Sequence, residues 1–171
     1  MATLSNLTFE SFGSCRAIGK NIPAGSMMQQ PNPIPALWDK AFETGLFAPL
    51  EEFNTLYGED AYIGFMYEMN AEGSDCQYMI GMFLQPGTLP PAGYDVYDVP
   101  ACAVAKAWIA GQPSDVFPSA HELTEQALRE AGYVPDYAPF CGCEVYTCAR
   151  YCVSREDGSI VLDYYIPCKK A

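Results

Sequence analysis

The chain is poor in basic residues: 9 Lys and Arg stand against 21 Asp and Glu, so its 171 residues carry a formal net charge of −12. The basic residues are scattered along the sequence and form no stripe. Nucleic acids and anionic membrane surfaces are bound through clustered Lys and Arg. The charge therefore argues against direct nucleic-acid binding and against a membrane-surface protein.

Targeting segments and common catalytic patterns are also missing. No apolar run reaches the roughly 20 residues that span a bilayer, and the first residues, Met-Ala-Thr-Leu-Ser-Asn, lack the features of a signal peptide. We therefore expect a cytoplasmic protein with reduced cysteines. The single histidine, His121, is expected in the first turn of a helix and on the surface, which argues against Ser-His-Asp or Cys-His catalysis. Glycine-rich phosphate motifs are absent.

Four of the 8 cysteines cluster as Cys141, Cys143, Cys148 and Cys152. Thiolates are good zinc ligands, so a zinc site is one interpretation. The spacing C-x-C-x4-C-x3-C does not match the usual paired C-x2-C pattern. Cys141 and Cys143 would also share one face of a strand, as two small core residues do. We therefore expect no metal site and no cofactor.

The order of hydrophobic patterns predicts a single α+β domain over residues 1–171. Apolar content of 50% and aromatic content of 13% suffice for one core. The pattern strand, helix, strand, strand occurs twice, in halves of about 9–86 and 92–169, and implies two βαββ units with antiparallel strands. The expected elements are a strand Phe9–Ile18, a helix stripe Leu37–Phe42, a hairpin of Ala61–Met69 and Gln77–Leu84, a strand Tyr94–Trp108 bent at Pro100, a helix from Ser119 to Gly132, and strands Gly142–Thr147 and Ile160–Ile166, the last ended by Pro167.

Glu144 is the residue that most needs a functional explanation. It lies in the strand-like, aromatic-rich stretch Phe140–Tyr146. Glutamate is disfavoured in strands, and a carboxylate is costly to bury without a partner. A carboxylate among aromatic rings favours a recess that receives a cation or a proton. The alternative is that Glu144 faces water on an open sheet.

Four segments in order resemble the GyrI-like effector-binding domains, the small-molecule-binding modules of bacterial multidrug-sensing and AraC-type regulators. The segments are Tyr78-Met-Ile-Gly81, Tyr97-Asp-Val-Pro-Ala101, Cys143-Glu-Val-Tyr146 and Asp163-Tyr-Tyr-Ile-Pro-Cys-Lys169. Their order and spacing agree over roughly residues 9–169. The resemblance implies a duplicated βαββ fold with a ligand cleft between the halves. It also implies that Glu144 is the pocket glutamate that meets cationic or lipophilic ligands, and it puts Tyr165 at the aromatic position of the terminal strand.

Regulators of this family carry a helix-turn-helix domain before the effector module, whereas nothing precedes Phe9 that could form one, so the chain resembles a stand-alone member. The function we expect is binding of lipophilic small molecules, cations among them, in an aromatic cleft. The resemblance to stand-alone members also implies two alternative functions. One is hydrolysis of cyclopropane-type natural products, with Glu144 as the base that activates water. The other is a protein-binding module that inhibits gyrase. The expected ligand-binding residues are Glu144, Tyr146, Tyr165, Trp108, Phe65 and Tyr67. Phe65 and Tyr67 share one strand face opposite Tyr62, and either face could form the core.

Overall fold

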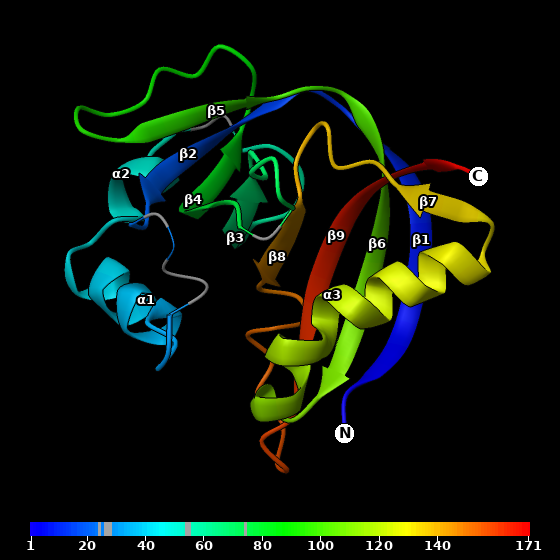
Figure 1. Cartoon of the computed structure of the whole chain (residues 1–171). Helices are drawn as coiled ribbons and strands as arrows, with labels where there is room; N and C mark the ends of the chain where they lie inside the picture. The colour runs from blue at the N-terminus through cyan, green and yellow to red at the C-terminus, as the bar shows by residue number, and fades with distance from the viewer. Residues whose placement is uncertain (24, 26–28, 54–55, 74) are drawn as a thin grey trace.

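The computed structural model describes residues 1–23, 25, 29–53, 56–73 and 75–171. Strands dominate, and three helices accompany them within this described part of the chain (Figure 1). The elements are β1 (Thr3–Phe12), β2 (Cys15–Asn21), α1 (Ile34–Glu43), α2 (Ala48–Glu51), β3 (Ala61–Tyr67), β4 (Gln77–Leu84), β5 (Asp95–Val99), β6 (Cys102–Gly111), α3 (Pro113–Glu130), β7 (Tyr133–Pro135), β8 (Gly142–Thr147) and β9 (Ile160–Lys170).

Within the described residues, nine strands form one antiparallel sheet, in the order β1-β6-β9-β8-β3-β4-β2-β5, with β7 paired to β9. The sheet has the same plan on either side of the junction between β3 and β8. Reading outward, one side runs β3, β4, β2 and the other runs β8, β9, β6, so β2-α1-β3-β4 and β6-α3-β8-β9 are two equivalent βαββ units. The outer strands are exchanged: β1 pairs with β6, and β5 pairs with β2. The α+β fold of two βαββ units is thus confirmed.

Helices α1 and α3 lie on the same face of the sheet, one over each unit (Figure 1). Ala41 of α1 and Val116, Ala120 and Leu128 of α3 belong to one buried cluster with Tyr78 and other strand residues. The spacing of these buried positions is that of a helix with one apolar stripe. We call this side of the sheet the helix-covered face.

The opposite side of the sheet, which we call the inner face, is buried without a helix. The sheet curls, so that rings from strands far apart in its order meet. Phe12 of β1 lies 5.4 Å from Phe83 of β4, and Phe65 of β3 lies 5.7 Å from Tyr97 of β5, measured between ring centroids. These contacts give the domain a second hydrophobic cluster on the inner face.

The first expected strand, Phe9–Ile18, is instead two strands that join different ends of the sheet. The break falls at Gly13 and Ser14, between β1 and β2. The Gly13 N–H donates a hydrogen bond to the hydroxyl of Tyr57, 2.6 Å away, and so leaves the strand ladder. Pro100 likewise ends β5 and separates it from β6, where the sequence predicted only a bend.

The expectation that Ser119 begins a helix was wrong. Helix α3 starts at Pro113 and includes Pro118. Proline fits the first helical position because an N–H group there would have no acceptor within the helix, so its absence costs nothing. Asp115 in the first turn complements the positive end of the helix dipole and pairs with the terminal ammonium of Met1 at 2.6 Å. The helix ends as expected before Gly132, whose φ of 84° suits a left-handed terminator.

Pro167 does not end the last strand, as the sequence predicted; β9 continues to Lys170. A proline lacks the N–H donor but keeps its carbonyl. That carbonyl accepts a hydrogen bond of 2.8 Å from the N–H of Asp136, and the short strand β7 pairs with the residues beyond it. None of the described helices is both long enough and apolar enough to cross a membrane.

Candidate ligand-binding site

Glu144 lies in the middle of β8, at the junction of the two units. Its neighbours across the strands are Gly64 of β3 and Tyr164 of β9. The carboxylate accepts two hydrogen bonds, from the hydroxyl of Tyr78 at 2.6 Å and from the hydroxyl of Tyr146 at 2.9 Å. Trp38 of α1 in turn donates its indole N–H to the Tyr78 hydroxyl at 3.1 Å. The carboxylate is therefore held by groups from both units of the sheet.

Gly64 makes this arrangement possible. Tyr78 comes from β4 and must reach across β3 to meet Glu144 on β8. A Cβ atom at position 64 would collide with the Tyr78 hydroxyl and ring and with Oε2 of Glu144. The backbone of Gly64 has no positive φ. A glycine is thus needed here because a side chain would clash with the two polar groups that meet above its Cα atom, and not because of its backbone conformation.

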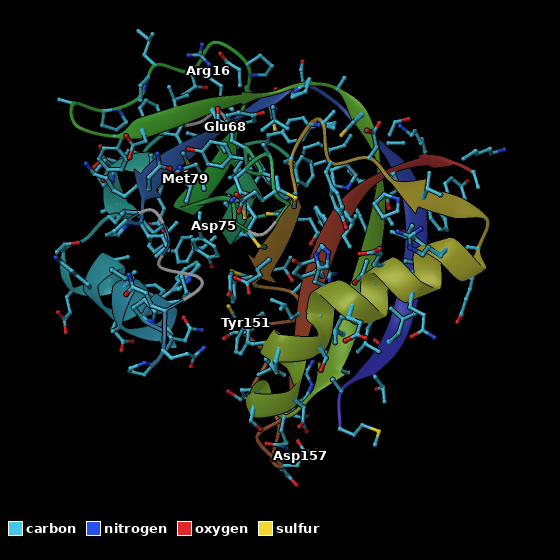
Figure 2. All side chains as sticks on the ribbon, in the orientation of Figure 1. Arg16, Glu68, Asp75, Met79, Tyr151 and Asp157 are labelled. Atoms are coloured by element: carbon cyan, nitrogen blue, oxygen red, sulfur yellow. The ribbon has the colours of Figure 1, made fainter. Side chains whose placement is uncertain are left out.

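Aromatic rings surround the carboxylate. The ring of Tyr146 lies 4.7 Å from that of Trp38 and 4.8 Å from that of Tyr151. Phe117 of α3 approaches Tyr146 at 6.4 Å, and Phe42 of α1 approaches Trp38 at 6.1 Å. In the view of Figure 2, Tyr151 lies between α1 and the first turns of α3.

These rings are accessible to different degrees. Trp38, Tyr146 and Tyr151 are partly buried. Phe42 is 56% exposed and Phe117 is 38% exposed. An aromatic surface that includes the exposed outermost rings of α1 and α3 therefore runs past the carboxylate.

The surroundings hold Glu144 in an electrostatically unusual state. Burial raises its pKa above the ordinary 4.5, and the hydrogen bonds from Tyr78 and Tyr146 only partly oppose this shift. Burial and the nearby carboxylate raise the pKa of both tyrosines well above 10, so both hydroxyls keep their protons. Among the ion pairs of the described residues, none includes Glu144. The described residues thus supply hydrogen bonds to this carboxylate but no ion pair.

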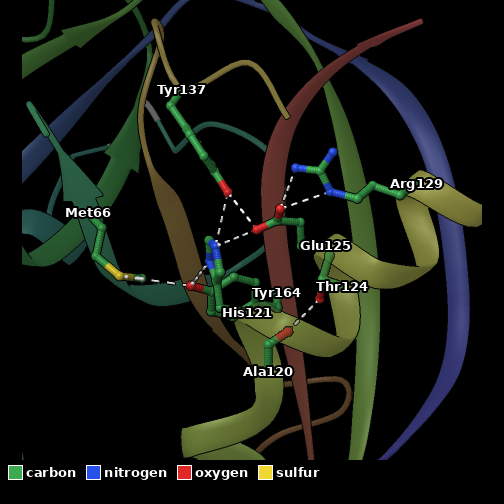
Figure 3. Close-up of polar contacts among 8 residues, drawn as sticks. All are labelled: Met66, Ala120, His121, Thr124, Glu125, Arg129, Tyr137 and Tyr164. Atoms are coloured by element: carbon green, nitrogen blue, oxygen red, sulfur yellow. Dashed lines mark hydrogen bonds and ion pairs between the residues drawn. The ribbon is translucent and has the colours of Figure 1, made fainter. Parts of the chain in front are cut away.

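A second polar network continues from Tyr164 toward α3 (Figure 3). The hydroxyls of Tyr164 and Tyr137 each lie 3.1 Å from a ring nitrogen of His121, on Nδ1 and Nε2 respectively. Tyr137 donates to Glu125 at 2.9 Å, and Arg129 pairs with the other oxygen of Glu125 at 2.6 Å. These contacts link the strand beside Glu144 to the surface of α3.

His121 is therefore not the solvated first-turn residue that the sequence predicted. It lies in the middle of α3 and is partly buried against Tyr137 and Tyr164. Burial lowers its pKa below 6.5, although Glu125 acts in the opposite direction. A neutral ring with its proton on Nε2 fits the two ring contacts: Nε2–H donates to Tyr137, which donates to Glu125, and Nδ1 accepts from Tyr164 when that hydroxyl points to it rather than to the sulfur of Met66 at 3.8 Å.

The structure brings together only two of the six residues expected to bind ligand, Glu144 and Tyr146. Phe65, Tyr67 and Tyr165 are buried on the inner face. Tyr165 pairs with Cys143, one position from Glu144, and successive strand residues point to opposite faces. The residue of β9 beside Glu144 is consequently Tyr164, and the structure does not bring Tyr165 to the carboxylate.

Trp108 also lies away from Glu144. Its ring packs against the guanidinium of Arg150 at 4.7 Å, and Arg150 holds the buried Asp163 with two contacts of 2.6 Å. Tyr165 lines a small hollow nearby, with a volume of about 90 Å³ and with Lys106 and Glu59 among its walls. This hollow is separated from Glu144 by the sheet.

Sequence reasoning missed Tyr78, Trp38, Tyr164 and Gly64 as parts of the site. Tyr78 had a signal, because it opens the Tyr-x-x-Gly segment of β4. Trp38 lies within the expected helix stripe Leu37–Phe42, and this apolar pattern indicates packing but no polar partner for the indole N–H. The roles of Gly64 and Tyr164 depend on the registers of β3 and β9 against β8, which no local pattern contains.

The clustered cysteines do not share one face. Cys141 belongs to the cluster of the helix-covered face and Cys143 to the cluster of the inner face. The strand alternation that predicted a shared face fails because β8 begins only at Gly142. In the part of the chain that the structure describes, no group of three or more His, Cys, Asp or Glu is placed to hold a metal ion.

Comparisons with solved structures show the same fold in bacterial proteins. A Staphylococcus aureus MU50 protein assigned to transcription regulation aligns with a TM-score of 0.65 and 18% identity, over 96% of this chain and 98% of its own. An integron cassette protein from Vibrio cholerae aligns with a TM-score of 0.60 and 12% identity, over 98% and 99%. SAV2435, whose structure is bound to tetraphenylphosphonium, aligns with a TM-score of 0.63 and 16% identity, over 96% and 94%.

A search of curated proteins gave no significant match. The model of the GyrI-like small molecule binding domain, in contrast, matches residues 19–169. This range includes nearly all of both βαββ units, from within β2 to the last residues of β9, and the two tyrosines that donate to Glu144. The chain therefore belongs to the GyrI-like small molecule binding domain family.

Proposed function

We propose that this domain binds lipophilic cations, and that the carboxylate of Glu144 is the anionic group that receives them. The observation that carries the proposal is a partly buried carboxylate that has two tyrosine donors and, among the described residues, no basic partner. A buried charge without a counter-ion is costly. A cationic ligand would supply the missing counter-ion.

The rings around Glu144 favour a cation with a large apolar body. Cations are attracted to the faces of Trp and Tyr, and the attraction grows when water is excluded. Trp38 and Tyr146 stand next to the carboxylate, while Phe42 and Phe117 extend the apolar surface outward. A hydrophilic cation such as ammonium would use the charge but would leave the apolar surface of Phe42 and Phe117 uncovered.

Family membership supports a small-molecule ligand, and one structural neighbour supports its charge. SAV2435 was solved bound to tetraphenylphosphonium, which is a cation inside four phenyl groups. A sequence identity of 16% shows only that the two proteins share a fold. The proposal that this chain binds a cation therefore depends on its own Glu144 and aromatic rings. The proposed site consists of Glu144, Tyr78, Tyr146, Trp38 and Tyr151.

Glu144→Gln tests the proposal because it keeps the shape and removes the charge. Binding of tetraphenylphosphonium should weaken by about 1–3 kcal/mol, the worth of a charge-assisted contact. Binding of neutral triphenylphosphine oxide should weaken less. Isothermal titration with both compounds measures the difference. Equal losses for the two compounds would remove the electrostatic role of Glu144.

Tyr165→Phe is the matched control. It removes one tyrosine hydroxyl on the inner face, in the strand that also carries Tyr164. The variant should bind tetraphenylphosphonium as the parent does. A loss comparable to that of Glu144→Gln would place the ligand on the inner face instead.

Hydrolysis of a cyclopropane-type electrophile is the alternative that the raised pKa of Glu144 favours, since a carboxylate with a raised pKa is a stronger base toward water. Incubation with a cyclopropane-bearing alkylator, followed by mass spectrometry, separates the two functions. We expect stoichiometric binding of the intact compound. Turnover beyond one equivalent that disappears in Glu144→Gln would instead establish an enzyme.

A further inference from the structure

The turn Cys148–Cys152, directly after β8, places two thiols close together. The N–H groups of Arg150 and Tyr151 donate to the carbonyl of Thr147 at 3.3 and 2.9 Å, which winds these residues into one helical turn. Side chains four residues apart in such a turn point the same way, with Cβ atoms roughly 5–6 Å apart. Cys152 is close enough to Cys148 to be one of the groups that raise the pKa of its thiol.

These two thiols are also the accessible ones. The structure describes all eight cysteines, and of these Cys148 and Cys152 alone are exposed; the others are buried or partly buried. A small reagent can therefore reach this pair without unfolding the domain. Proximity and access are the two requirements for a dithiol that reacts as a unit.

We propose that Cys148 and Cys152 form an oxidisable dithiol that a low-molecular-weight disulfide, such as oxidised glutathione, converts to an intramolecular disulfide. The thiolate of one cysteine attacks a glutathione sulfur, forms a mixed disulfide and releases one reduced glutathione. The second protein thiolate attacks the mixed disulfide, forms the Cys148–Cys152 bond and releases the second glutathione. Two protein thiols lose two protons and two electrons, and one glutathione disulfide gains them.

The bond is of the reversible kind. A disulfide needs Cβ atoms about 3.5–4.5 Å apart, so the turn must tighten by roughly 1–2 Å from its helical spacing. The N–H of Cys148 donates to the carbonyl of Asp60 at 3.4 Å, and the N–H of Cys152 donates to the carbonyl of Thr147 at 3.3 Å. Val153 and Ser154, which follow Cys152, are exposed, so the chain on that side can follow a movement of Cys152. Strained, exposed disulfides are the more easily reduced ones.

Burial and the neighbouring Cys152, Asp60 and Glu51 raise the pKa of Cys148. Because the thiolate is the nucleophile, oxidation should accelerate as the pH rises. The raised pKa of Cys148 thus slows the reaction, while the geometry of the turn determines which bond forms.

Oxidation also has a route to the ligand site. Tyr151 lies between the two cysteines in sequence, and its ring meets that of Tyr146 edge-on at 4.8 Å. Tyr146 donates to Glu144. Drawing Cys152 toward Cys148 shifts Tyr151 between them and so disturbs its edge contact with Tyr146. This coupling depends on the proposed ligand site, whereas formation of the disulfide does not.

The test treats the reduced full chain with oxidised glutathione, blocks the remaining thiols with N-ethylmaleimide and digests with trypsin. Cleavage after Arg150 separates the two cysteines, so a disulfide leaves two peptides joined. The first peptide also contains Cys141 and Cys143; Cys148→Ser therefore serves as the control and should abolish the link. Stable glutathione adducts on single cysteines, or a link that survives in Cys148→Ser, would overturn the proposal.

The affinity for tetraphenylphosphonium should fall about two- to tenfold on oxidation, the range that one aromatic contact is worth. The variant Cys148→Ser/Cys152→Ser should show no change with oxidant. An unchanged affinity in protein shown by mass to be oxidised would overturn the coupling. If Glu144→Gln binds the cation as tightly as the parent, the proposed ligand site is wrong. The linked peptides still show whether the disulfide forms, so the two proposals can be judged separately.

Discussion

Replacing Gly64 with alanine tests whether the space above this residue is what the site requires. The added Cβ collides with the Tyr78 hydroxyl and with Oε2 of Glu144, so the hydrogen bond between them must break or stretch. A hydrogen bond to a charged group is worth about 1.5–3 kcal/mol. Alanine at an ordinary φ otherwise stabilises a protein by about 0.4–1 kcal/mol through the unfolded state. The net expectation is a loss of about 2 kcal/mol.

Thermal unfolding measures this loss directly. For a chain of this size, one kcal/mol corresponds to roughly 2–4 °C in Tm, so Gly64→Ala should lower Tm by roughly 4–8 °C. Tyr78→Leu removes both atoms of Tyr78 that crowd the new Cβ. In that background Gly64→Ala should cost much less, and the difference gives the coupling free energy. An alanine variant as stable as the parent would refute the steric argument.

The remaining predictions concern charge and metal. Burial raises the pKa of Glu144 above 4.5, so its protonated form favours folding, and this contribution to stability is lost as the pH rises through the folded-state pKa. Urea titrations across that pH range should show that Glu144→Gln becomes more stable relative to the parent. Over the same range the affinity of the parent for the cation should rise. Arg150→Met should cost about 3–5 kcal/mol in chemical denaturation because it leaves the 2%-exposed Asp163 charged and unpaired, and adding Asp163→Asn should recover most of it. Elemental analysis of protein purified without chelator should find no stoichiometric zinc; one zinc per chain, lost in Cys143→Ser, would contradict this expectation.

Element order was readable from the sequence because turn residues and apolar runs are local signals. The hairpin of β3 and β4 pairs Ile63 with Gly81, as expected for two runs that flank a polar turn. Errors arose where proline and glycine were interpreted without their neighbours. The helix was expected only from Ser119 although Pro118 lies inside α3, and Gly13 was passed over although it separates two strands.

The central residue of the candidate site could be chosen from the sequence, but its neighbours could not. Glutamate is disfavoured in a buried strand, and this conflict between residue type and position can be recognised from the sequence alone. The partner tyrosine on β9 depends on register, and a shift of one residue exchanges the two faces of a strand. That single step separates Tyr164, beside Glu144, from Tyr165 on the inner face.

The exchange of the outer strands determines the order in which this domain can be completed during synthesis. The ten residues of β1 leave the ribosome early, yet their partner β6 begins only at Cys102. Until then one whole ladder of N–H and C=O groups on β1 has no native partner, and β2 likewise waits for β5. Pairings across such long stretches of chain form slowly. A nascent chain of this protein therefore carries unpaired strand edges from the synthesis of β1 until that of β6, the interval in which a holding chaperone would matter most.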